Sequence, residues 1–257
     1  MKICFLVLSA DYPPWRDLFS KCGKITWANV TSQEIEFDIF EYRGKSLPPI
    51  YSKFVNFLKN SKLKKIFWKR TINNHKYVDI RMRNSELLEC KVSETWDNIM
   101  LKTLAAINFA LNYKDYDYII RINTTTYVNL SELQKYLMTT PKYAGASSEK
   151  NFAPGWSIIL SRESAEKLVR NANFPYNQGL RNDDHSIGDI LSGFGIYPWQ
   201  TSCSIVTSKM INPKHKQDIQ RSVFTRIKSE SADREQDSEL FELVHKYITE
   251  SSETSSL

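Results

Sequence analysis

Residues 118–130 read YIIRINTTTYVNL, and this stretch decides the fold class. Its first half is an apolar run broken only by Arg121, and its second half begins with Asn123 and three threonines. A short apolar run bounded by polar residues is typical of a buried strand. Ligands of α/β proteins bind beyond the carboxyl ends of such strands. The stretch therefore predicts a central strand that ends at a functional site.

Segments on both sides of this stretch alternate between strand-like and helix-like patterns. Strands are predicted at residues 3–9, 34–42, 77–81 and 156–160, and helices at 51–70, 97–111, 131–138, 161–169 and 184–193. Ser131 and Ser161 are expected to cap the helices that they begin. This order favours an α/β fold with a Rossmann-like mixed, mainly parallel sheet flanked by helices. We expect one domain over residues 1–229, and an acidic helix near 239–248 with a disordered serine-rich tail in residues 230–257.

The composition is that of a globular protein with no membrane-spanning segment. Of the 257 residues, 41% are hydrophobic and 25% are charged, and no apolar run approaches the ~20 residues that a spanning helix needs. The apolar run at residues 3–8 is shorter than the core of a signal peptide, about 7–15 residues. We therefore expect a cytoplasmic protein, and its four cysteines, which have no CxxC spacing, should be reduced.

The net charge of +6 is unevenly distributed. Residues 230–257 hold eight acids and two bases and so carry −6, which leaves +12 on the first 229 residues. A basic body favours an acidic partner, such as the phosphates of a nucleotide, an anionic membrane or a nucleic acid. The alternative is a basic surface that is merely solvated.

Residues 59–70, KNSKLKKIFWKR, interleave basic and aromatic side chains. This pattern suits peripheral contact with an anionic membrane. The same side chains are able to bind a nucleic-acid backbone, with Trp68 stacked on a base, although nucleic acid is the less expected partner. A third interpretation is an exposed helix face with one buried aromatic residue.

Four stretches resemble the fringe and β-1,3-galactosyltransferase group of glycosyltransferases, in the same order and with similar spacing. They are ETWDNIMLKTL at 94–104, YIIRINTTTYVNL at 118–130, NFAPGWSIILSRESAEKLV at 151–169 and NDDHSIGDIL at 182–191. The match is good over residues 90–200 and weak over 3–27. The resemblance implies a GT-A fold and transfer of a sugar, with inversion, from a nucleotide-diphosphate donor, preferably a UDP-sugar. The acceptor would be an oligosaccharide or a lipid-linked glycan, joined by a β-1,3-type bond. Members of this group that work in the Golgi have a membrane anchor, so its absence here suggests a bacterial or viral origin.

Two adjacent aspartates are the candidate catalytic residues. Asp183 and Asp184 precede apolar residues at helical spacing and so lie at a helix N-terminus, whose dipole favours ionised carboxylates. The family motif implies that Asp184 is the base that deprotonates the acceptor hydroxyl. Asp183 would then orient the acceptor or the loop. The alternative is that the two residues are a helix cap and an ordinary first-turn charge.

In the family, three acidic residues that end the central strand hold Mn²⁺ against the donor diphosphate. Here Asn123, Thr124 and Thr125 occupy those positions. Neutral oxygens are poor ligands for a hard dication, so we expect no metal, with Mn²⁺ held by other acids such as Asp115 or Asp117 as an alternative. Asn123 is still able to bind the ribose and Thr125 a phosphate. Cations would then have to stabilise the leaving diphosphate. The candidates are Arg16, Arg121 and a cluster in a mobile loop over 207–221, which consists of Lys209, Lys214, His215 and Lys216.

Further donor and acceptor contacts follow from position in the fold. The residues after the first strand, where this fold receives the base of the nucleotide, are Ser9, Ala10 and Asp11. Lys102 is either beside the donor or an ordinary exposed helix lysine. The acceptor candidates are Gly155, for close backbone approach, and Trp156, which either stacks on a sugar or belongs to the core. Two rival functions remain: a catalytically inactive protein that binds sugar or nucleotide, and a nucleic-acid-modifying transferase.

Overall fold

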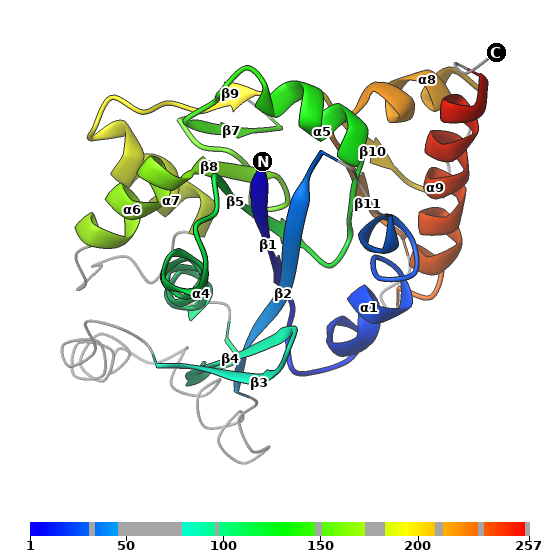
Figure 1. The fold of residues 1–257 in the computed structure, drawn as a ribbon. Coiled ribbons are helices and arrows are strands. Elements are labelled where there is room, and N and C mark those ends of the chain that lie inside the picture. The colour runs from blue at the N-terminus through cyan, green and yellow to red at the C-terminus, as the bar shows by residue number, and fades with distance from the viewer. Residues whose placement is uncertain are drawn as a thin grey trace.

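The computed structural model describes residues 1–30, 34–45, 79–95, 98–146, 151–172, 183–208, 213–230 and 234–254 (Figure 1). Its strands are β1 (Lys2–Leu8), β2 (Glu36–Lys45), β3 (Ile80–Asn84), β4 (Leu87–Ser93), β5 (Tyr118–Asn123), β6 (Thr126–Val128), β7 (Tyr143–Gly145), β8 (Ile158–Ser161), β9 (Trp199–Gln200), β10 (Cys203–Val206) and β11 (Phe224–Ile227). Its helices are α1 (Trp15–Lys21), α4 (Ile99–Tyr113), α5 (Leu130–Leu137), α6 (Arg162–Asn171), α7 (Asp183–Ser192), α8 (Pro213–Arg221) and α9 (Asp237–Thr254), with a 3₁₀ turn at Trp27–Asn29.

The strands form two sheets. The larger has the order β3-β4-β2-β1-β5-β8-β7-β9, and the smaller has the order β10-β11-β6. In the larger sheet four of the seven strand pairs are parallel, which makes it mixed and mainly parallel. The predicted α/β class, with helices flanking such a sheet, is confirmed.

The centre of the larger sheet is β1 between β2 and β5, and all three run parallel. Residues 3–7 of β1 are fully buried, as expected for a strand covered on both faces. Its last residue, Leu8, pairs with Asn123, the last residue of β5. Because parallel strands end at the same edge, the loop after β1 and the turn after β5 leave the sheet side by side.

The side chains of β1 alternate between two hydrophobic cores. Ile3, Phe5 and Val7 belong to a core with residues of α1, α5 and α9, and Cys4 and Leu6 belong to one with residues of α4, α6 and α7. Figure 1 shows the corresponding arrangement, with α4, α6 and α7 on one side of the sheet and α1 and α9 on the other.

Several element boundaries differ from the expected ones. The cap of α5 is Asn129, whose side-chain oxygen accepts a hydrogen bond from the Glu132 N–H at 3.3 Å, and not Ser131. The cap of α6 is Ser161, as predicted. Helix α8 occupies much of the segment expected to be a mobile loop at 207–221, because Ile219 packs into the core.

The acidic C-terminal helix is longer than expected. Helix α9 begins at Asp237 and ends at Thr254, so it includes Ser251 and Ser252, which were assigned to a disordered tail. Phe241 and Val244, within the predicted range, are fully buried in the core that contains half of β1, and this packing stabilises the helix. The domain division at residue 229 stays a prediction.

Other expectations have simpler outcomes. All four cysteines are unpaired, as predicted. In the ranges that the structure describes, no helix is long and apolar enough to cross a bilayer. The helix expected at 51–70 and the basic aromatic segment 59–70 lie outside the described residues.

Candidate active site

The candidate site is built where β5 ends and α7 begins. Strand β5 brings Arg121 and Asn123 to the edge of the sheet, and the first turn of α7 contributes Asp183 and Asp184. The loop before β8 adds Gly155 to the same place. Thr103 of α4 hydrogen-bonds to Asp183, so the structure brings together residues from all four stretches that carry the family resemblance.

Arg121 is the centre of a buried polar cluster. Its side chain is 3% exposed, and its guanidinium lies 2.8 Å from Asp183 Oδ2. It also donates to Asn123 Oδ1 at 2.8 Å and to the Tyr42 hydroxyl at 3.2 Å. Burial is the largest single effect on Arg121 and opposes its charge, but Asp183, Tyr42 and the charge of Asp184 together outweigh it, so the pKa of the guanidinium is raised. Such an ion pair persists in a core because its remaining hydrogen bonds are satisfied.

Asp183 is neutralised within this cluster. Its side chain is 5% exposed, and besides Arg121 it accepts a hydrogen bond from the Thr103 hydroxyl at 2.9 Å. Thr103 in turn lies 3.0 Å from the Tyr42 hydroxyl, and burial raises the pKa of Tyr42 to about 12. Asp183 thus joins α7 to α4, β2 and β5, which is a more specific role than the simple helix cap considered as an alternative.

Asp184 has a different environment. It is partly exposed, and its Oδ2 accepts a hydrogen bond from the Gly155 N–H at 3.2 Å. Its Oδ1 accepts from the His185 N–H at 2.9 Å, and the His185 ring stacks on Phe152. Within the described residues no cation forms an ion pair with Asp184. Its carboxylate is thus oriented by backbone N–H groups and is able to take a proton from a bound hydroxyl.

Gly155 is required by close packing. A Cβ added at this position would lie 2.5 Å from Nη1 of Arg121. In the structure the group close to Gly155 is the side chain of Arg121. The expectation that an acceptor sugar approaches the backbone at Gly155 stays a prediction. Trp156 is 7% exposed and belongs to the core, in agreement with the second interpretation of this residue.

The residues in the metal-binding positions of the family are largely occupied by protein contacts. Thr124 and Thr125 are 2% and 4% exposed, and the Thr125 carbonyl accepts from the Ile227 N–H at 2.9 Å. Asn123 is partly exposed, but its side-chain oxygen Oδ1 accepts a hydrogen bond from Arg121. Mn²⁺ prefers carboxylate oxygens, and the carboxylate that shares Arg121 with Asn123, that of Asp183, is already paired with this arginine. These residues do not fit a dication.

The loop after β1 holds a separate ionic contact. Ser9 and Ala10 are buried, and the Ser9 N–H donates to the Tyr42 carbonyl at 3.1 Å. Arg16 lies 3.1 Å from Asp11 Oδ1 and also donates to the Asp11 carbonyl at 2.7 Å. Arg43 lies 3.7 Å from the same carboxylate oxygen. Arg16 is thus engaged with its own loop, and its expected contact with a diphosphate stays a prediction.

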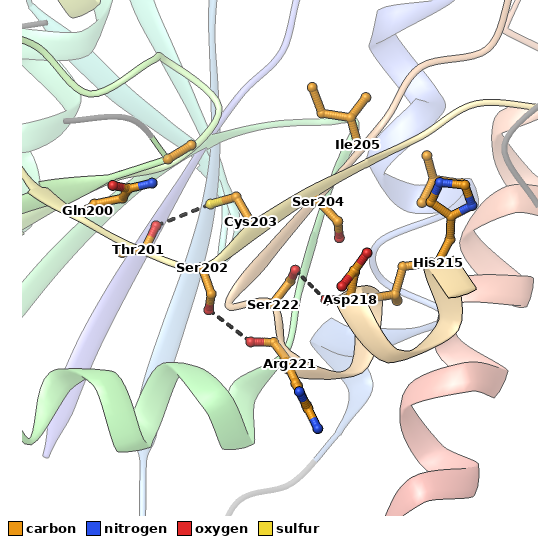
Figure 2. A pocket seen from close by; sticks show the side chains of 13 residues that line it. Gln200, Thr201, Ser202, Cys203, Ser204, Ile205, His215, Asp218, Arg221 and Ser222 are labelled. Carbon is orange, nitrogen blue, oxygen red and sulfur yellow. Dashed lines mark hydrogen bonds between the residues drawn. The ribbon is translucent and has the colours of Figure 1, made fainter. Parts of the chain in front are cut away.

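Lys102 and His215 are not among the residues that surround Asp184. The side chain of Lys102 is 1% exposed and pairs with Glu94, so the expectation of an exposed helix lysine is wrong. His215 lies on α8, where it lines a pocket of about 470 Å³ between β10 and α8 (Figure 2). This pocket is lined mainly by polar residues of 200–206 and 215–222, and Asn123, Gly155 and Asp184 are absent from it.

One residue beside the site has no counterpart in the sequence-based expectations. Arg226 on β11 pairs across the strands with Thr126, which directly follows the Asn-Thr-Thr segment. Its guanidinium carbon lies 5.9 Å from the centre of the Trp156 ring. The local sequence FTRIK, residues 224–228, predicts at most a short strand. The contacts that give Arg226 its position come from Thr126 and Trp156, which are far away in the chain, so no local pattern marks this residue.

Comparisons with known proteins find similarity only among solved structures, and at low sequence identity. No protein-family model matches the chain, and no curated protein matches it significantly. Among solved structures, galactosyltransferase LgtC, in complex with donor and acceptor sugar analogs, aligns with 12% identity and a TM-score of 0.46 over 97% of this chain and 96% of its own. The glycosyltransferase GlyE of Streptococcus pneumoniae TIGR4, in its apo form, aligns with 11% identity and a TM-score of 0.45 over 96% of this chain and 60% of its own.

A third solved structure is a glycosyltransferase involved in the glycosylation of the major capsid of PBCV-1. It aligns with 11% identity and a TM-score of 0.45 over 93% of this chain and 99% of its own. All three TM-scores are below 0.5, a level from which neither the reaction nor its residues can be transferred to this chain. What the chain does has to be argued from its own site.

Proposed function

We propose that this chain is a GT-A glycosyltransferase that moves a hexose or pentose, with inversion, from a nucleotide-diphosphate donor to a hydroxyl of a glycan. The observation that carries this proposal is the difference between the two aspartates of α7. Asp183 is buried and paired with Arg121, whereas Asp184 is partly exposed, oriented by the Gly155 N–H and without an ion pair in the described residues. A carboxylate of the second kind is suited to act as a general base.

The proposed reaction is a single displacement. Asp184 accepts the proton of the acceptor hydroxyl, the oxygen bonds to C1 of the sugar, and the bond from C1 to the diphosphate oxygen breaks. The electron pair of that bond leaves with the nucleoside diphosphate. Direct attack from the side opposite the leaving group inverts the anomeric carbon. The resemblance to the β-1,3-galactosyltransferase group supports a UDP-sugar as donor and an oligosaccharide or lipid-linked acceptor.

Metal independence is part of this proposal. It is supported by the position of Arg121, a permanent cation that already binds the oxygens of Asn123 and Asp183. A dication at this place would have to displace Arg121 from a buried ion pair, which is costly. The chain's own cations would then stabilise the charge that develops on the leaving diphosphate.

The base is tested by Asp184→Asn, which keeps the size of the side chain and one of its two acceptor oxygens but cannot accept the proton. Transfer and hydrolysis are measured over a panel of nucleotide sugars with glycan acceptors. We expect kcat/KM to fall by about 10²–10⁴. Asp189→Asn, on the exposed side of the same helix, is the matched control and should leave the rate unchanged. Equal, measurable rates for Asp184→Asn and the wild type would reject Asp184 as the base, and donor binding without turnover in both would reject the enzyme in favour of a protein that only binds sugar or nucleotide.

A further inference from the structure

Arg226 has a defined position relative to the candidate base. Residues paired across neighbouring strands point to the same face, so Arg226 and Thr126 lie on one face of the smaller sheet. The Thr126 hydroxyl donates to the Trp156 carbonyl at 3.0 Å, and the Arg226 guanidinium packs against the ring of Trp156. Trp156 directly follows Gly155, whose N–H donates to Asp184. Arg226 is therefore connected to the candidate base through Gly155 and Trp156, two consecutive residues of the loop before β8.

The charge of Arg226 is not neutralised in the described part of the chain. Other arginines near the site have acidic partners: Arg121 pairs with Asp183, Arg16 with Asp11, and Arg234 with Asp237. No carboxylate among the described residues forms an ion pair with Arg226. Burial, and then the positive charge of Arg234, lower the pKa of Arg226, although a guanidinium remains protonated at neutral pH.

A partly buried cation without a counterion is an unfavourable arrangement that a bound anion would relieve. Trp156 stabilises the guanidinium through its ring face, but a cation–π contact leaves the N–H donors at the edge of the guanidinium able to bind an anion. Arginine offers these donors in a fork that matches phosphate oxygens. The ligand expected from this arrangement is a phosphate or diphosphate group.

We propose that Arg226 binds the diphosphate of the nucleotide-sugar donor and stabilises it as a leaving group. This inference rests on the proposed function and adds to it the residue that performs the task of the missing dication. When the bond from C1 to the diphosphate oxygen breaks, its electron pair remains on that oxygen, and the N–H groups of Arg226 donate to the oxyanions so formed. No proton has to be transferred to the diphosphate.

The first test uses inorganic pyrophosphate, which contains neither sugar nor base. Its binding to the full chain is measured by isothermal titration calorimetry in EDTA. We expect Arg226→Ala to weaken binding about tenfold to a hundredfold, because a charge-assisted hydrogen-bond pair is lost. The affinity of Arg226→Lys for pyrophosphate should lie between those of the wild type and Arg226→Ala, because lysine supplies the charge but not the forked pair of donors. Arg170→Ala, in which a largely exposed arginine of α6 is removed, is the control and should bind as the wild type does.

The second test compares UDP with uridine. We expect Arg226→Ala to lose affinity for UDP and to keep that for uridine, and to lower kcat for any donor that the wild type uses. Arg226→Gln keeps part of the packing on Trp156, and its thermal midpoint separates loss of fold from loss of the anion site. Pyrophosphate affinity that is unchanged in Arg226→Gln and Arg226→Ala would overturn the proposal.

The outcomes separate this inference from the proposed function. Pyrophosphate binding that depends on Arg226, in a chain that transfers no sugar, would support the anion site and reject the transferase. Transfer at the wild-type rate by Arg226→Ala would reject the role of Arg226 and leave the transferase in place.

Discussion

Arg121 on β5 and Arg226 on β11 lie against neighbouring residues of the loop before β8, Gly155 and Trp156, and they differ in what balances their charge. Arg121 is fully enclosed and binds Asp183, Asn123 and Tyr42. Arg226 is partly exposed, lies over the Trp156 ring and has no ion pair with a carboxylate of the described residues. A buried charge that is paired and hydrogen-bonded holds the side chains around it in place. A charge without a counterion is able to bind an anionic ligand.

The same contrast separates the two aspartates of α7. Asp183 is the counterion of Arg121 and ties α7 to the sheet, and Asp184 is presented to the site by that attachment. Neighbouring residues of one helix turn thus have different tasks because their side chains point into different environments. The predictions below test this division, beginning with the largest expected effect.

Removal of the buried cation should be the most damaging change. Arg121→Met leaves Asp183 buried without a counterion, and we expect the free energy of unfolding to fall by about 3–5 kcal/mol. Urea denaturation monitored by circular dichroism measures this loss. Arg170→Met, at an exposed position of α6, should leave the midpoint where it is. A stability of Arg121→Met equal to that of the wild type would show that the Arg121 cluster does not hold the site together.

A smaller loss is expected from Gly155→Ala. The new methyl group would lie 2.5 Å from Nη1 of Arg121, and three partners prevent this side chain from moving away. Overpacking of this kind costs about 1–3 kcal/mol. Gly193→Ala, where the nearest atom is 3.3 Å from the added Cβ, is the control and should cost less.

The cause of this loss is checked with the double variant. If the clash with Arg121 is responsible, the cost of Gly155→Ala should shrink when Arg121 is already replaced by Met, so the two free-energy changes should not add. If the free-energy changes of Gly155→Ala and Arg121→Met add, the cost of Gly155→Ala has another origin in the loop before β8.

The sequence predicts the parts of this molecule that depend on local patterns. The isoleucines of β5, the Ser161 cap of α6 and the aspartates that begin α7 are each readable within about ten residues, and the structure confirms all three elements. The order of strands and helices is sufficient for the α/β class, because it follows from the same local signals.

The charge pairing of the site could not be predicted in this way. Arg121 was assigned to the donor because a cation beside a strand end is expected to face the ligand, and its burial against Asp183 follows only from the packing of α7 on the sheet. Likewise, β6 and β11 are too short to be recognised by periodicity, and they become strands through pairing with each other. Arg226 was missed because its position depends on that pairing.

The smallest effect is expected from Asn123→Asp, which introduces a carboxylate at one of the positions where the family has its metal ligands. The nearest cation is Arg121, whose Nη1 lies 2.8 Å from the present Asn123 oxygen, so the new carboxylate should pair with the arginine. We expect a change in the free energy of unfolding of less than about 1 kcal/mol. Neither the thermal midpoint nor the transfer rate should respond to Mn²⁺, as measured against the same protein in EDTA. Asn123→Ala, which removes the oxygen, controls for loss of the present hydrogen bond. A midpoint of Asn123→Asp that rises with Mn²⁺ would mean that a dication competes successfully with Arg121, and the contrast between the two arginines would then lose its basis.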